Sequence, residues 1–117
     1  MMEIRKLLTI HDLAQNFLKA PRINNNEFGL SITYDYEMES GEYGEKTIFF
    51  EDVKDYRYTS ESDVTKDILN AYNAISEVVN STWLSRETLG KGYKHYIIYF
   101  DEYGAYEIIA KSYRFPK

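Results

Sequence analysis

The chain contains no cysteine and only two prolines among its 117 residues. Without cysteine it can form neither a disulfide scaffold nor a thiolate metal site, and it has no cysteine nucleophile. The longest run without a charged side chain, residues 68–76, has nine residues and is too short to cross a membrane as a helix. The N-terminal residues show no secretory signal, because they lack an uninterrupted apolar segment and a small-residue cleavage site. We therefore expect a cytoplasmic protein.

Familiar catalytic and cofactor-binding patterns are missing as well. The glycines of residues 90–92 have neither the P-loop spacing nor the dinucleotide-binding spacing. His11 and His95 stand apart, with none of the histidine spacings that hold a metal, and His95 is interpreted as a structural hydrogen-bonding residue at the start of a strand. The adjacent carboxylates Glu51 and Asp52 would point to opposite faces of a strand, so they cannot act as an acid–base pair. No enzyme activity, cofactor or metal is expected.

What the sequence does have is the composition of a folded globular protein. Apolar residues make up 44% of the chain and charged residues 28%. A chain of this length forms one domain and is large enough to bury a core without disulfides or metals. We therefore expect a single domain over residues 1–117.

Two segments have helical periodicity. In residues 9–20 apolar side chains recur at helical spacing after Thr9, and Pro21 ends the pattern. In residues 63–80 a longer stripe follows capping residues. The apolar members of this second stripe are Val64, Ile68, Ala71, Tyr72, Ile75, Val78 and Val79. These patterns predict an N-terminal helix and one long helix.

Other segments alternate with a period of two, as β-strands do. They are residues 30–38, 46–53, 56–59, 95–100 and 105–113. The last two are separated by Asp101-Glu102-Tyr103-Gly104, which is typical of a hairpin turn with Gly104 at a positive φ. The expected fold class is α+β, with about four antiparallel strands in one sheet, the long helix packed on one face, and the N-terminal helix.

The negative charge of the chain is concentrated in one segment. Residues 27–63 carry three basic and eleven acidic side chains, a net charge of −8, whereas the whole chain carries −5. Such a field repels nucleic acids and anionic membranes and attracts basic partners. The alternative interpretation is a solvated surface that keeps the protein soluble.

The candidate binding site lies within this segment, where an acidic strand face meets an aromatic residue. Three carboxylates alternate with Tyr34 and Tyr36 and are expected to face solvent if these tyrosines lie in the core. The acidic face continues into the following turn, where Tyr43 is flanked by glutamates and could anchor a partner. The partner-binding candidates are Asp35, Glu37, Glu39, Glu42, Tyr43 and Glu45.

Two sequence patterns resemble those of small bacterial proteins. The first, a strand, is matched by Phe50, Val53, Tyr56 and Thr59, and the second, a C-terminal hairpin, by His95, Tyr99, Phe100, Asp101, Tyr103, Gly104, Tyr106, Ala110 and Ser112. Together they resemble YxiG-like proteins and related immunity proteins of polymorphic toxin systems, over roughly the C-terminal two-thirds of the chain. The resemblance implies a protein that neutralises a toxin.

The leading hypothesis is thus a non-enzymatic protein that binds a basic, nuclease-like toxin domain through its acidic face, without contacting nucleic acid or membrane. The alternative is a regulatory or interaction protein of a mobile element or another bacterial pathway, using the same surface. The third hypothesis is a small-molecule-binding protein or an enzyme with a pocket between helix and sheet.

Overall fold

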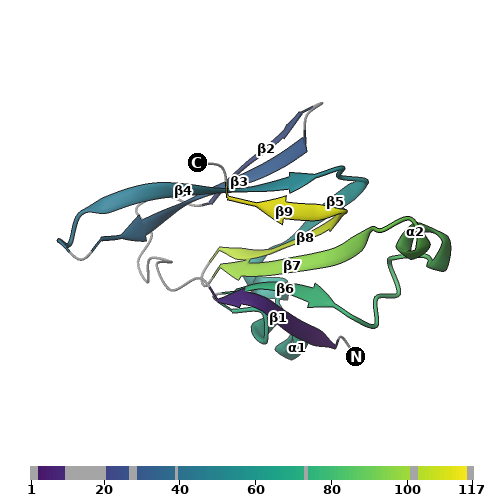
Figure 1. The fold of residues 1–117 in the computed structure, drawn as a ribbon. Helices are drawn as coiled ribbons and strands as arrows, with labels where there is room; N and C mark the ends of the chain where they lie inside the picture. The colour runs from purple at the N-terminus through teal and green to yellow at the C-terminus, as the bar shows by residue number, and fades with distance from the viewer. Residues whose placement is uncertain are drawn as a thin grey trace.

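The structure, a computed structural model, describes residues 3–9, 21–26, 29–38, 40–72, 74–100 and 103–115. In these ranges the chain forms nine β-strands in two antiparallel sheets, with only short helical segments (Figure 1). The five-stranded sheet has the order β1 (Ile4–Thr9), β6 (Ala74–Val78), β7 (Lys94–Phe100), β8 (Gly104–Ala110) and β5 (Asp55–Thr59). The four-stranded sheet has the order β2 (Arg22–Asn26), β3 (Gly29–Glu37), β4 (Tyr43–Glu51) and β9 (Ser112–Arg114).

Two chain segments pass from one sheet into the other and so connect the sheets. β4 continues into β5 and β8 continues into β9, and these strands pair antiparallel on both sides of the crossing. At the crossing the Lys54 N–H donates to the Ile109 carbonyl at 2.8 Å, and the Lys111 N–H donates to the Glu51 carbonyl at 3.1 Å. Asp52 adopts a positive φ of 55° between β4 and β5. The backbone hydrogen bonds thus continue from one sheet into the other.

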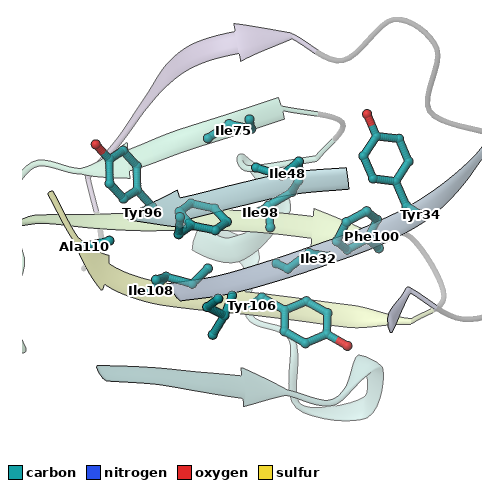
Figure 2. Close-up of a cluster of buried hydrophobic side chains, with 12 residues drawn as sticks. Ile32, Tyr34, Ile48, Ile75, Tyr96, Ile98, Phe100, Tyr106, Ile108 and Ala110 are labelled. Carbon is teal, nitrogen blue, oxygen red and sulfur yellow. The ribbon is translucent and has the colours of Figure 1, made fainter. Parts of the chain in front are cut away.

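The main core lies between the sheets. Alternate residues of β3 and β4 contribute Leu30, Ile32, Tyr34, Ile48 and Phe50, and β6, β7 and β8 contribute Ile75, Tyr96, Ile98, Phe100, Tyr106, Ile108 and Ala110 (Figure 2). All of these side chains are buried. Each strand therefore presents one apolar face to the other sheet, as the period of two requires.

A second apolar cluster covers the other face of the five-stranded sheet. The short helical segments η1 (Glu61–Asp63) and α1 (Lys66–Leu69) precede β6. This cluster contains Ile68, Ala71, Val78, Ile97, Tyr99 and Ala105. The strands β7 and β8 are therefore buried on both faces, which explains their nearly continuous apolar sequences.

The expected long helix over residues 63–80 is wrong. Its sequence divides into η1, α1 and the strand β6. Ile68 and Ile75, expected on one helix face, are both buried but lie in different clusters, and Tyr72 is exposed. The segment Ala74–Val78 also fits a strand that is covered on both faces, because such a strand buries Ile75 and Val78 on opposite sides and both residues are β-branched. Pairing with β7 and β1 decides between the two periods.

The expected α+β class with a single sheet is also wrong, because the chain is mainly β with two sheets. The residues 105–113 were expected to form one strand, yet they contribute β8 to one sheet and β9 to the other. β2 contains three asparagines, which favour turns, but its pairing with β3 overrides that preference. The N-terminal helix was expected over residues 9–20. Thr9 is the last residue of β1, and residues 10–20 lie outside the described residues.

The other strand predictions are confirmed. The strand expected at residues 30–38 is β3, and those expected at 46–53, 56–59 and 95–100 correspond to β4, β5 and β7. Gly104 has the positive φ expected of it, 103°. In the described part of the chain, no helix is long and apolar enough to span a membrane.

Candidate functional site

The acidic segment forms the free end of a long hairpin. β3 pairs with β4 over its whole length, but β2 pairs with β3 only up to Thr33, and β9 pairs with β4 only from Phe49 onward. Among the described residues, the outer half of the hairpin is therefore a two-stranded ribbon, and in Figure 1 it extends to the left beyond the five-stranded sheet. Its end is closed by a hydrogen bond of 2.7 Å from the Met38 N–H to the Glu42 carbonyl.

One of the expected surface carboxylates is buried. Asp35 is only 2% exposed, so the prediction that it faces solvent is wrong. Arg22 of β2 places its Nη2 3.5 Å from Asp35 Oδ1 and 3.0 Å from Glu45 Oε1, and Glu45 pairs with Asp35 across the hairpin. A buried carboxylate needs such a cation nearby. The prediction failed because the alternation of polar and apolar residues does not show which face of a strand is covered by another part of the chain.

Of the other site candidates, Glu45 lies level with Asp35, and Glu42 and Tyr43 lie closer to the free end. Glu42 and the side chain of Glu45 are exposed, and Tyr43 is half-buried opposite Glu37. The side chain of Glu37 and the whole of Glu39 lie outside the described residues. We call Met38 and residues 40–45 the hairpin tip. Here Met38 is 39% exposed, and its N–H binds the carbonyl of Glu42, whose side chain is also exposed.

A second polar constellation lies on the outer face of the five-stranded sheet. Arg57 of β5 stands opposite Glu107 of β8, and its Nε and Nη2 donate to the two carboxylate oxygens at 3.0 and 2.9 Å. His95 of β7 approaches the same carboxylate, with 2.8 Å between Nε2 and Oε1. On its other side, His95 Nδ1 lies 2.7 Å from the Ser81 hydroxyl. The four side chains, hereafter the polar relay, form one connected chain of hydrogen bonds.

The charge of Glu107 fixes the roles in this relay. Burial acts to raise the pKa of Glu107, but hydrogen bonds from His95 and Arg57, together with the positive charge of Arg57, outweigh it and lower the pKa to about 2. The hydrogen bond to Glu107 in turn raises the pKa of Arg57. An ionised carboxylate can only accept, so His95 must donate from Nε2. In a neutral imidazole Nδ1 is then an acceptor, and the Ser81 hydroxyl donates to it.

Trp83 covers the relay. The Arg57 guanidinium stacks on the face of its ring, with 4.3 Å between Cζ and the ring centroid. The Trp83 and His95 rings meet edge-on, with 5.2 Å between their centroids. The loop that carries Trp83 is held by a hydrogen bond of 3.0 Å from the Leu84 N–H to Ser81 Oγ. Beside the relay the surface has a hollow of about 290 Å³, lined by Arg57, Thr65, Asp67, Val78, Asn80, Ser81, Thr82, Trp83 and His95.

The relay was missed at the sequence level, although one signal pointed to it. Glu107 interrupts the apolar strand Gly104–Ala110, and a carboxylate there needs a partner if the strand is buried. Pairing the hairpin through its turn places His95 and Glu107 on one face of neighbouring strands. Ser81, Trp83 and Arg57 come from other elements, and no local pattern connects them. Among the described residues, no group of histidine, aspartate and glutamate could hold a metal ion.

No protein-family model, curated protein or solved structure matches the chain. The resemblance to YxiG-like and immunity proteins therefore stays a prediction, and the two sites are interpreted from their own geometry.

Proposed function

We propose that the protein is a binding protein whose hairpin tip docks a basic protein partner. The observation that carries this proposal is the outer half of the β3–β4 hairpin, which pairs with no third strand among the described residues and has an exposed methionine and an exposed glutamate at its end. A methionine side chain adapts to an apolar contact, and an exposed carboxylate at the same end of the hairpin attracts a cationic surface. Such binding needs no catalytic residue.

The charge distribution supports a basic partner over a nucleic acid. The segment of residues 27–63 keeps its net charge of −8 as a whole, although Arg22 of β2 offsets part of it at Asp35 and Glu45. Glu42 lies beyond this offset, at the end of the ribbon. We therefore place the first electrostatic contact at Glu42, and not along the whole strand face.

The family resemblance implies a toxin domain as the partner, and the acidic segment favours a basic, nuclease-like one, met in the cytoplasm. A protein of another bacterial pathway, reached through the same tip, is the alternative. The proposal requires a cationic surface of either partner, so its test is whether a basic protein binds at the hairpin tip.

A capture experiment with matched charge changes tests the proposal. The parent protein, Glu42→Lys and Glu87→Lys would each be immobilised and exposed to a lysate of the source cells, and bound proteins eluted with salt. Glu87 is 83% exposed on α2 (Arg86–Gly90), at the end of the molecule opposite the hairpin tip in Figure 1. Its reversal therefore changes the net charge by the same amount as Glu42→Lys but leaves the charge of the tip unchanged. We expect a basic protein to be retained by the parent and by Glu87→Lys and lost by Glu42→Lys. Equal retention by all three would refute the hairpin tip as the binding surface.

A further inference from the structure

The Ser81 hydroxyl has the hydrogen-bond arrangement of an activated nucleophile. A serine hydroxyl has one donor and two acceptor positions. The donor position is used on His95 Nδ1 at 2.7 Å, and one acceptor position takes the Leu84 N–H at 3.0 Å. One lone pair is left on this oxygen, and Ser81 is among the residues that line the hollow of about 290 Å³.

His95 is held as a base toward this hydroxyl. The Glu107 carboxylate binds the Nε2–H, so the lone pair of Nδ1 faces Ser81. Glu107 is itself fixed by two hydrogen bonds from Arg57 and is almost fully buried, so neither its position nor its charge can change easily. A nucleophile, a base and a third group that orients the base are the parts that covalent catalysis requires.

The hollow limits what could react there. Its volume suits a small acyl group, and its wall includes the Trp83 ring and the side chains of Arg57 and Thr82. Two of the five N–H groups of Arg57 bind Glu107, so the guanidinium keeps further donors and a positive charge at the wall. Positive donors at the wall of a site stabilise the oxyanion of a tetrahedral intermediate.

We propose that Ser81 is a nucleophile that accepts the acyl group of a small carboxylic ester, with His95 as general base, Glu107 as a positioning residue, and Arg57 as both a positioning residue and the donor to the oxyanion. Ser81 Oγ attacks the ester carbonyl carbon while its proton moves to His95 Nδ1. The tetrahedral intermediate collapses, the bond to the alcohol oxygen breaks, and the leaving alkoxide takes the proton from Nδ1. Water attacks the acyl-serine in the same way, which releases the carboxylic acid and restores Ser81.

This activity goes beyond binding at the hairpin tip and uses a different face of the molecule. It also departs from the expectation of a protein without catalytic residues.

The chain contains its own matched control. Ser85 also accepts a hydrogen bond from the N–H three residues ahead, that of Thr88, at 3.1 Å. Its hydroxyl donates to Thr88 Oγ1 at 2.8 Å and not to an imidazole. Ser81 and Ser85 therefore have the same type of local turn, but only Ser81 has an imidazole as hydrogen-bond partner. A reactivity that needs His95 must appear at Ser81 alone.

The probe is p-nitrophenyl acetate, with release of p-nitrophenol followed in solution and the acetylated peptides mapped by mass spectrometry. We expect acetyl-Ser81 and no acetyl-Ser85 in the parent, loss of the Ser81 adduct in Ser81→Ala, and parent-like rates in Ser85→Ala. His95→Gln should slow acetylation of Ser81 by about 100-fold or more, the usual contribution of a general base. Tryptophan fluorescence of each variant would confirm that Trp83 keeps its folded environment.

A second probe keeps the test decisive if His95→Gln does not fold. A fluorophosphonate reacts with activated serines, so labelling of the parent and of Ser85→Ala at Ser81 supports the proposal without any change in the relay. Acetylation confined to lysines, labelling of Ser81 and Ser85 to equal extents, or a Ser81 rate unchanged in folded His95→Gln would each overturn it.

Discussion

Replacing Glu107 by glutamine tests whether the polar relay stabilises the fold through its charge. The Glu107 side chain is only 3% exposed and accepts hydrogen bonds from Arg57 and His95. Its pKa falls from the ordinary 4.5 to about 2 in the folded protein. At about 1.4 kcal/mol per tenfold change in proton affinity, this difference corresponds to about 3 kcal/mol of folding free energy.

The sign follows from the direction of the shift. Because the folded pKa is lowered, the stabilisation is complete above the unfolded pKa of 4.5 and is lost as the pH falls from there toward 2. Glu107→Gln is neutral at every pH. It should therefore be about 3 kcal/mol less stable than the parent at neutral pH, with about half of this difference left near pH 3.

Urea unfolding at several pH values, followed by the single tryptophan, measures this difference. Trp83 packs on both Arg57 and His95, so its fluorescence reports on the relay directly. Glu87→Gln is the control, since this exposed glutamate pairs with Lys91 across one helical turn and such a surface pair should contribute less than about 0.5 kcal/mol. A Glu107→Gln difference under 1 kcal/mol, or one that stays the same between neutral and acidic pH, would refute the reasoning.

Two further predictions concern the packing. Gly104→Ala should destabilise the protein by about 2–4 kcal/mol, because Gly104 has a φ of 103° and a Cβ there would collide with the carbonyl oxygen of Thr59. Gly41→Ala, at a φ of 85° with open space around it, should cost about 1 kcal/mol, and equal melting temperatures for the two variants would contradict the collision. Ile75→Ala should cost about 2–4 kcal/mol through lost burial and a cavity between the sheets. Chemical denaturation that shows a loss below 1 kcal/mol would contradict this placement of Ile75.

Local pattern and turn chemistry predict part of this fold. The alternation in β3 and β7 and the turn before Gly104 are visible in the sequence because neighbouring residues create them. The class of residues Ala74–Val78 is not, since helical and strand periods both fit the segment and pairing with distant strands decides. The crossing of β8 into β9 is equally hidden, because one apolar run serves two sheets.

The candidate sites divide in the same way. The hairpin tip could be located because its charges and its turn are close in the sequence. The burial of Asp35 could not, because it depends on Arg22 of another strand and on what covers the hairpin face. The polar relay brings together residues from β5, β7, β8 and a loop, so it exists only once the register of the sheet is known.

Association kinetics of the captured partner test the central claim, that the hairpin tip attracts a basic protein, most directly. Rates for the parent, Glu42→Lys and Glu87→Lys would be measured from low to high ionic strength. A carboxylate that meets a cationic surface speeds association at low salt, and this gain disappears as salt screens the charges. We expect Glu42→Lys to associate about tenfold or more slowly than the parent at low salt, with a flatter salt dependence, and Glu87→Lys to follow the parent. Equal rates and equal salt dependence for Glu42→Lys and Glu87→Lys would contradict the claim.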